Sequence, residues 1–381
     1  MLHHTVLVIA SLLFTLLSLE LYFRIFDPQT LYMSRPDPVL GWVHVANMTG
    51  YRNESCLKTT FHFNSEGMRD VEHTYDKPPG VYRIAVIGDS FVNAQEVDLE
   101  DTFFRRLQHI LRGQGYNVEV LGFGVRGFGT DQEYRLLENF ALKYLPDLVV
   151  LAFVSNDVRN NSLALEKNPA KPYFELAAGG ELVPRPFTPM PDYSESWKSF
   201  LFVNSHLLRF VYFRAARITA IHNTLVKFGI YANVISVPQG PDDLLDDTVY
   251  RDPPWPPEWE ASWDITRALL RKMQAASTDA GADFILFFVT SQLQVSDEAF
   301  GELQAAHPRI ALGYDNLEKR LATFSSEAGI SCVTSLPAMR ALQATGTDVH
   351  PVCDGHWTRA AHHRAAEILT EYLLSGDYFQ R

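Results

Sequence analysis

The chain has 381 residues, of which 46% are apolar and 20% are charged, and it carries a formal net charge of −12 at pH 7. This composition is that of a globular protein with a substantial core, and it excludes a disordered chain. The acidic balance and the lack of a basic stripe argue against nucleic-acid binding as the main role.

An apolar segment occupies residues 5–23, and its polar members are Ser11, Thr15, Ser18 and Glu20. As a helix it would span roughly 28 Å at ~1.5 Å per residue, close to the ~30 Å hydrocarbon core of a bilayer. Neither a basic start nor a small-x-small cleavage site accompanies it. We therefore predict that residues 1–27 form an uncleaved, single-pass membrane anchor. A cleaved signal peptide and a buried core helix are the alternatives.

The orientation of this anchor is predicted from the residues on its C-terminal side. Arg24 and Arg35 come after the apolar segment, and by themselves they favour a cytoplasmic location for the domain beyond them. Large domains, however, translocate largely regardless of such charges. We predict that the domain lies in the periplasm or another extracytoplasmic compartment.

Strands and helices alternate over most of the remaining chain. Residues 28–80 form a proline-marked connector and N-terminal extension, and residues 81–381 form the main domain. Short apolar runs predict parallel strands at residues 82–87, 117–123, 148–154, 283–289 and 330–334. Periodicity predicts helices capped by Asp101 and by Thr130 or Asp131, and others at about 263–280, 314–328 and 358–374. This alternation predicts a three-layer α/β/α fold with a mostly parallel central sheet.

Residues 160–258 interrupt this alternation. They are proline-rich at both ends and contain an aromatic helical stretch at residues 200–228. We interpret the segment as an insertion over the edge of the sheet.

Polar motifs stand at the ends of three predicted strands. Gly88-Asp89-Ser90 ends the first strand, a glycine-rich loop at residues 122–132 follows the second, and Ser155-Asn156-Asp157 follows the third. Open α/β folds place their chemistry at the carboxyl ends of strands. Asp354 and His356 stand on another predicted loop near the C-terminus. A serine at a strand end with such an Asp/His pair provides the parts of a nucleophilic hydrolase.

Each of these three residues has a predicted role. Ser90 is the candidate nucleophile, and its hydroxyl needs a base within hydrogen-bond reach. His356 is the candidate base, which takes the proton and returns it to the leaving group. Asp354 would hold the imidazole tautomer and stabilise the imidazolium.

The order of the motifs resembles that of the SGNH (GDSL-like) hydrolase family, over about residues 80–160 and 350–372. Residues 64–70 also resemble the Asn-Ser-x-Gly-x-Arg-Asp segment of membrane-anchored bacterial members, which are often linked with cell-surface or exopolysaccharide pathways. The resemblance implies a flavodoxin-like fold. It also implies an oxyanion hole made by the backbone N–H groups of Ser90 and Gly127 and the amide of Asn156.

Gly122 departs from the family pattern, because many relatives carry asparagine at this position of the glycine-rich loop. Around the site, Asp89 is expected to hold the nucleophile loop through local hydrogen bonds. Trp357 either lines the pocket or packs beneath the loop. Arg69 and Arg126 either meet an anionic substrate or are solvated surface residues. The histidines lack metal-ligand spacing, so we predict neither a metal nor another cofactor.

The three cysteines are Cys56, Cys332 and Cys353, and they form no CxxC motif. In an oxidising compartment, Cys332 and Cys353 could form a disulfide that pins the loop of Asp354. The alternative is three unpaired, buried thiols.

We predict a serine esterase that removes an acyl group, with O-acetyl favoured, from a glycan or lipid-linked saccharide through an acyl-Ser90 intermediate. Its partners are then an acylated saccharide or another ester, and the membrane through residues 5–23. The first alternative is an O-acyltransferase of cell-surface or exopolysaccharide modification, in which the same intermediate is discharged onto a sugar hydroxyl. The second alternative is a non-catalytic glycan-binding scaffold.

Overall fold

The computed structural model describes residues 2–54, 56–192, 196–216, 218, 221, 224 and 244–379. Its centre is a five-stranded sheet with the order β11-β10-β7-β5-β6, in which all neighbouring strands are parallel. The strands are β5 (Tyr82–Gly88), β6 (Val118–Gly124), β7 (Leu148–Phe153), β10 (Asp283–Phe288) and β11 (Ser331–Thr334). Counted along the chain, this is the strand order of flavodoxin-like sheets. The predicted parallel sheet is confirmed.

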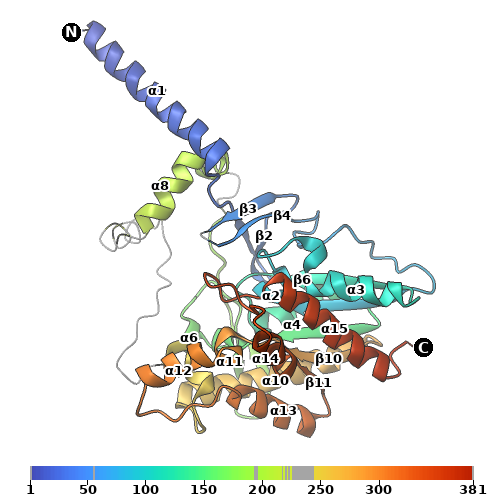
Figure 1. Cartoon of the computed structure of the whole chain (residues 1–381). Coiled ribbons are helices and arrows are strands. Elements are labelled where there is room, and N and C mark those ends of the chain that lie inside the picture. The colour runs from blue at the N-terminus through green and yellow to red at the C-terminus, as the bar shows by residue number, and fades with distance from the viewer. Residues whose placement is uncertain are drawn as a thin grey trace.

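Helices cover both faces of this sheet (Figure 1). Side chains alternate along β5, so that Ile84 and Val86 enter one core and Ala85 and Ile87 enter the other. The first core lies under α3 (Phe103–Gly113), α14 (Leu336–Ala344) and α15 (Arg359–Ser375). The second lies under α4 (Thr130–Asn139), α10 (Pro257–Asp279) and α13 (Asn316–Ala328). The predicted three-layer α/β/α fold is therefore confirmed.

Shorter elements connect these layers. They are α2 (Ser90–Asn93), α5 (Asn156–Asn160), α6 (Leu163–Glu166), α11 (Gln292–Val295), α12 (Asp297–Ala306) and the 3-10 turns Leu99–Asp101, Ala141–Tyr144 and Leu245–Tyr250. Two of them matter for the site, because α2 and α5 begin just after β5 and β7. Their first residues therefore lie at the carboxyl edge of the sheet.

Two helices begin differently from the prediction. Thr102 stands at the N-cap of α3, while Asp101 closes the preceding 3-10 turn and accepts a hydrogen bond from His363 Nε2 at 2.9 Å. Gly129 stands at the N-cap of α4, and Asp131 instead forms a fully buried ion pair with Lys171 at 3.0 Å. In both cases the carboxylate that was expected to cap the helix binds another partner.

The N-terminal helix α1 (Leu2–Phe26) extends away from the sheet and its covering helices (Figure 1). Among the residues that the structure describes, one helix is long and apolar enough to cross a membrane, and it comprises His3–Phe26 of α1. Most of its apolar side chains are exposed, including Phe14 at 73% and Leu17 at 69%. Length and composition thus allow a membrane span here.

The predicted connector at residues 28–80 is folded. It contains two antiparallel pairs, β1 (Ser34–Asp37) with β2 (Gly41–His44) and β3 (Thr49–Asn53) with β4 (Lys58–His62). Trp42 on β2 donates from Nε1 to the carbonyl of Arg126 at 3.1 Å, which brings this pair to the loop after β6. Sequence reasoning missed these strands because they are short and pair outside the central sheet.

The segment predicted as an insertion contains β8 (Phe174–Leu176), β9 (Leu182–Pro184), α7 (Trp197–Asn204) and α8 (His206–Ala216). In its described part, the predicted aromatic helix of residues 200–228 is two helices, α7 and α8, separated at Ser205. Residues 217, 219, 220, 222, 223 and 225–228 of that prediction lie outside the described residues. Figure 1 shows α8 beside the end of α1 that is nearer the sheet, and the two helices are in contact.

Candidate active site

Ser90 is presented by a tight turn at the end of β5. Asp89 caps the short helix α2, and its Oδ1 accepts a hydrogen bond from the backbone N–H of Phe91 at 2.9 Å. Gly88 precedes it in a crowded position, where an added Cβ would lie 2.6 Å from the side chain of Val92. The strand therefore has to end in glycine for the turn to fit against α2.

His356 lies directly beside this serine. Its Nε2 is 2.8 Å from Ser90 Oγ, although the two residues are 266 positions apart in the sequence. Its Nδ1 forms a short hydrogen bond with Oδ1 of Asp354, which also accepts the backbone N–H of His356 at 2.9 Å. The structure thus brings Ser90, His356 and Asp354 into one continuous chain of hydrogen bonds.

The charges around this chain act on both of its titratable members. Burial lowers the pKa of His356, but the hydrogen bond with Asp354 and the charge of Glu96 outweigh it and raise this pKa above its ordinary value. Burial alone would raise the pKa of Asp354. Hydrogen bonds from His356 and Arg52 nevertheless hold that pKa well below its usual range. Asp354 is therefore ionised at neutral pH, next to an imidazole whose protonated form it stabilises.

Sequence reasoning missed two residues of this cluster, Arg52 and Glu96. Arg52, on β3, donates from Nη2 to Asp354 Oδ2 at 2.6 Å, and its Nη1 forms a short ion pair with Glu96. Glu96 is buried, with an Oε1 that lies 3.0 Å from Arg126 Nη1 and 3.5 Å from His356 Nδ1. Neither residue belongs to a motif, so the sequence held no signal for either one.

Neither alternative for the cysteines, a Cys332–Cys353 disulfide or three unpaired thiols, agrees with the structure. Cys353, next to Asp354, forms a disulfide with Cys56, with Cα atoms 6.0 Å apart, and Cys332 is free. Cys332 lies on the edge strand β11, whereas Cys56 comes from the turn between β3 and β4. The hairpin that supplies Arg52 is thus also linked covalently to the loop of Asp354 and His356.

The three groups expected to form an oxyanion hole lie on loops of adjacent strands. Asn156 Nδ2 donates to Asp89 Oδ2 at 3.2 Å, and Ser90 Oγ lies 3.3 Å from the same oxygen. Gly127 has a φ of +77°, a left-handed conformation that favours glycine. Its loop is joined to the end of β5 by a 3.2 Å hydrogen bond from Val125 N to Gly88 O. Asn156 is therefore fixed beside Ser90, and Gly127 lies on the loop next to it.

Trp357 is fully buried beneath the catalytic loop. Its ring makes edge-to-face contacts with Phe91, Phe103 and Phe287. The two alternatives for Trp357 are a place in the pocket lining and packing beneath the loop, and its contacts are those of packing. Its indole therefore joins the loop to the core formed with α3 and α15.

Neither Arg69 nor Arg126 is a solvated surface arginine. Arg69 is 2% exposed and donates to backbone carbonyls at and after the end of α2, including that of Asn93 at 3.0 Å. Arg126 is partly exposed and pairs with Glu96. Arg69 thus stabilises the end of α2, the helix that begins with Ser90, and it is too buried to face a substrate.

Gly122 also has a clear packing role. Its backbone N–H donates to Asp70 Oδ2 at 2.8 Å, and an added Cβ would lie 2.6 Å from the ring of Phe104. An asparagine at this position would not fit against this ring.

The ligand atoms of Glu96, Asp354 and His356 lie within 4.8 Å of one another, which is close enough to hold a metal ion. However, the guanidinium of Arg52 binds both carboxylates of this group. A fixed positive charge at that position opposes the binding of a divalent cation. The donor set therefore fits an ion pair better than a metal site.

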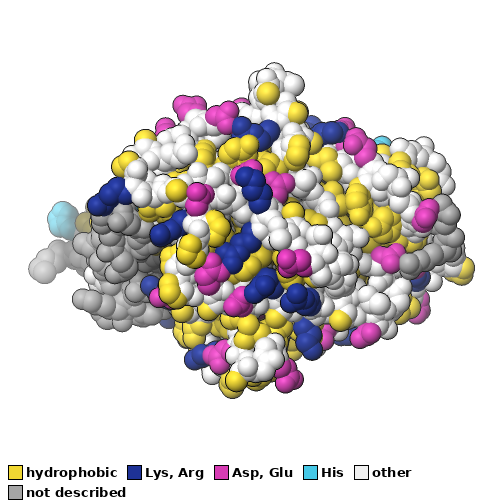
Figure 2. All heavy atoms as spheres, turned by 90° about the horizontal axis from the view of Figure 1, so that it is seen from below, with side chains coloured by type: hydrophobic (Ala, Val, Ile, Leu, Met, Phe, Trp, Pro, Cys, Tyr) yellow, Lys and Arg dark blue, Asp and Glu magenta, His cyan; other side chains and the backbone are white. Residues whose placement is uncertain are grey.

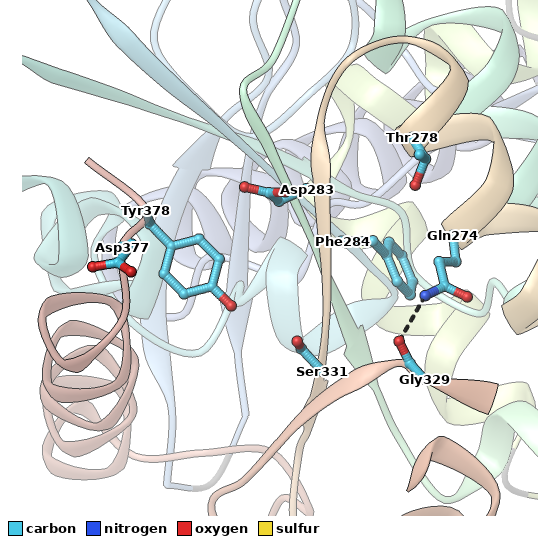
Figure 3. A pocket seen from close by; sticks show the side chains of 8 residues that line it. All are labelled: Gln274, Thr278, Asp283, Phe284, Gly329, Ser331, Asp377 and Tyr378. Atoms are coloured by element: carbon cyan, nitrogen blue, oxygen red, sulfur yellow. Dashed lines mark hydrogen bonds between the residues drawn. The ribbon is translucent and has the colours of Figure 1, made fainter. Parts of the chain in front are cut away.

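Two hollows lie away from Ser90. A cavity of about 350 Å³ at the amino ends of β10 and β11 is lined by Asp283, Ser331 and Tyr378, among others (Figure 3). Ser90 is at the opposite, carboxyl end of the sheet, so this cavity is not part of its site.

The second hollow, of about 540 Å³, lies between α10 and α13. The face of the molecule seen in Figure 2 carries basic and acidic side chains close together. In the hollow, Arg320 pairs with Glu260 and lies 4.2 Å from the ring centroid of Trp255. The guanidinium of Arg320 in this hollow is therefore already bound by side chains of the protein itself.

Comparisons with known proteins give distant matches. No family model matches the chain, and no curated protein matches it. Among solved structures, the crystal structure of TesA has 12% identity and a TM-score of 0.39, with 77% of this chain and 98% of that chain covered. The lipase/acylhydrolase from Enterococcus faecalis has 12% identity, coverages of 77% and 96%, and a TM-score of 0.39. Axe2, an acetylxylan esterase from Geobacillus stearothermophilus, has 11% identity, coverages of 76% and 93%, and a TM-score of 0.39.

Proposed function

We propose that this chain is a membrane-anchored serine esterase of the SGNH (GDSL-like) type. It removes an acyl group, with O-acetyl favoured, from a glycan or lipid-linked saccharide. The observation that supports this proposal most directly is the hydrogen-bonded chain from Ser90 through His356 to Asp354. A hydroxyl 2.8 Å from an imidazole that is itself held by a carboxylate is the arrangement of an activated serine nucleophile.

In the first half of the reaction, Ser90 attacks the ester carbonyl while His356 Nε2 takes the hydroxyl proton. The tetrahedral intermediate then collapses. Its C–O bond to the sugar breaks as His356 returns the proton to the leaving sugar oxygen, and the acyl group stays on Ser90. In the second half, a water molecule attacks the acyl-enzyme while His356 takes a proton from it. The bond between the acyl carbon and Ser90 Oγ then breaks as His356 returns the proton to Oγ, and the carboxylic acid leaves.

The oxyanion of each tetrahedral intermediate would be bound by the backbone N–H groups of Ser90 and Gly127 and by the amide of Asn156. One donor of this kind typically contributes ~10²–10³ in rate. A side-chain amide has two N–H donors, and the bond of Asn156 to Asp89 uses one of them. Asp89 would thereby orient both Asn156 and the turn that carries Ser90.

Arg52 and Glu96 are proposed as positioning residues. Arg52 binds the Asp354 oxygen that does not bind His356. This leaves the other oxygen for the imidazole and fixes the plane of the carboxylate. Glu96 in turn binds the other terminal nitrogen of Arg52, Nη1.

The catalytic domain is proposed to lie outside the cytoplasm, held by α1. The disulfide between Cys56 and Cys353 supports this placement, because such bonds persist in oxidising compartments. An extracytoplasmic position also suits an enzyme whose substrate is a surface glycan.

The proposed activity is tested with the full chain in detergent and p-nitrophenyl acetate as substrate. We expect Ser90→Ala to lower turnover by ~10³-fold or more, as is usual for loss of such a nucleophile. Ser326→Ala, on the exposed side of α13, is the matched control and should keep the wild-type rate. Equal rates for wild type and Ser90→Ala would refute the esterase and favour a non-catalytic scaffold. With an oligosaccharide added, acetyl groups recovered on the sugar would identify acyl transfer instead of hydrolysis.

A further inference from the structure

Helix α8 contacts the end of α1 through a partly buried polar joint. The carboxylate of Glu20, on α1, accepts the backbone N–H groups of His206 at 3.0 Å and Leu207 at 2.9 Å, and the hydroxyl of Ser205 at 2.9 Å. Arg24, one turn further along α1, donates to the same carboxylate at 2.8 Å. A side chain of α1 thus satisfies the backbone N–H groups that begin α8.

A second arginine fastens α7 to the same joint. Arg209, on α8, is fully buried and donates to the carbonyls of Phe202 at 2.6 Å and Val203 at 2.7 Å, which end α7. It also contacts the hydroxyl of Tyr51 on β3. The two helices are therefore held at a defined angle to α1 and to the N-terminal hairpin.

The outward faces of α7 and α8 are apolar and uncovered. On α7, Trp197, Phe200 and Leu201 are 70%, 66% and 44% exposed, and their spacing places them on one side of the helix. On α8, Leu208 and Val211 are 40% and 52% exposed. Several large apolar side chains exposed together are unusual on a soluble protein, and they mark a contact surface.

We propose that this face of α7 and α8 lies in the interface of the same lipid bilayer that α1 crosses. We choose the bilayer as the partner of this face because the joint at Glu20 places α8 directly against α1. The exposed apolar surface of α1 therefore continues onto the outward face of α7 and α8. Tryptophan and phenylalanine suit the boundary between headgroups and acyl chains. Lys198 and Arg214, which are exposed on the same helices, can reach anionic headgroups.

The proposed contact would fix how the catalytic domain faces the membrane. Tyr51 and Arg52 are neighbours on β3, so their side chains point to opposite faces of that strand. Tyr51 contacts the joint at Arg209, and Arg52 contacts the catalytic acid Asp354. One short strand therefore connects the membrane contact to the catalytic loop.

The native tryptophans provide a first test. Of the six tryptophans, Trp197 is exposed, while the others are buried or, in the case of Trp42, half-buried. In nanodiscs with brominated phospholipids, we expect quenching of the fluorescence of the full chain, and loss of most of this quenching in Trp197→Phe. Trp42→Phe is the matched control and should be quenched like wild type. Equal quenching of wild type and Trp197→Phe, or no quenching of wild type, would overturn the proposal.

Spin labels extend the test to α8 in a Cys332→Ser background, which keeps the disulfide. Labels at Phe200→Cys and Val211→Cys should be more accessible to oxygen than to a water-soluble nickel chelate, as at Leu13→Cys on α1. Val183→Cys, 46% exposed on β9, should show the opposite order. Water-accessible labels on α7 and α8 would contradict a bilayer contact, and so would labels shielded from both reagents, as by a second copy of the chain. Neither measurement depends on ester turnover, so its result is independent of the proposed activity.

Discussion

The nucleophile turn and the β3–β4 hairpin reach the same site by different routes. Ser90 is placed by a strand of the central sheet, a glycine with no room for a side chain, and the cap residue Asp89. Arg52 is placed by a strand that pairs with β4 and bridges to Leu31, outside the central sheet. The nucleophile position thus follows from local sequence, whereas the environment of the catalytic acid depends on a distant segment.

The largest effect is expected at the acid itself. Asp354→Asn keeps the size of the side chain but removes the charge that holds the tautomer of His356. We expect a loss of about 10⁴-fold in kcat with p-nitrophenyl acetate, the usual result of this change in a triad. Asp348→Asn, which alters an exposed aspartate before the same loop, is the control. A loss of less than tenfold would mean that Asp354 does not act on His356 as proposed.

The hairpin is tested next through Arg52→Ala. Hydrogen bonds to charged groups contribute about 1.5–3 kcal/mol, which corresponds to about tenfold to hundredfold in rate if Arg52 acts through Asp354. We expect kcat to fall within this range, with a smaller change in KM for a short acetyl ester. Arg185→Ala removes an exposed arginine of a peripheral ion pair and should leave the rate unchanged.

The pH profile of activity distinguishes an effect of Arg52 on the base from a purely structural role. Removal of this cation leaves Asp354 without its arginine partner and Glu96 with Arg126 alone. The added net negative charge favours protonated His356, so the acid limb of kcat/KM should move to higher pH. Glu96→Gln should move the limb to lower pH, because the charge of Glu96 raises the pKa of His356. If both variants lose activity without opposite shifts, Arg52 and Glu96 act on folding and not on the base.

These expectations show where sequence reasoning succeeds. The β5 strand, its terminal glycine and the α2 cap are set by residues adjacent in sequence, so the position of Ser90 could be predicted. His356 and Asp354 could be predicted because both stand on one short loop before a helix. Arg52 could not, since its contact spans 302 positions and carries no motif. The same holds for Cys56, because its pairing with Cys353 depends on how the β3–β4 hairpin packs against the loop of Asp354.

A smaller effect on activity is expected from loss of the disulfide. Cys56→Ser removes the link between the hairpin and the loop of Asp354 but leaves the ion pair with Arg52. Disulfides typically stabilise by about 2–4 kcal/mol, and we expect a loss of this order in the free energy of unfolding, measured by urea denaturation. Activity of the folded variant should fall only a few-fold, because Arg52 still binds Asp354. Cys332→Ser keeps the disulfide and is the control, and unchanged stability of Cys56→Ser relative to it would contradict the prediction.

The smallest effect is a pH-dependent contribution of His356 to stability. Burial lowers the pKa of this histidine, but its hydrogen bond with Asp354 and the charge of Glu96 prevail, so the folded-state pKa is raised. Such a group stabilises the folded state fully below its unfolded pKa of ~6.5, and this contribution disappears as pH rises through the folded pKa. His356→Gln removes the titration.

We therefore expect the free energy of unfolding of wild type, relative to His356→Gln, to be greatest below about pH 6.5 and to decrease at higher pH. Urea denaturation of both proteins over a series of pH values measures this difference. His109→Gln, at an exposed position of α3, controls for the loss of one imidazole. A difference that grows with pH would mean that burial prevails over Asp354 and Glu96. Asp354 and Glu96 would then not raise the pKa of His356, and the proposed electrostatic role of the groups around the catalytic loop would be wrong.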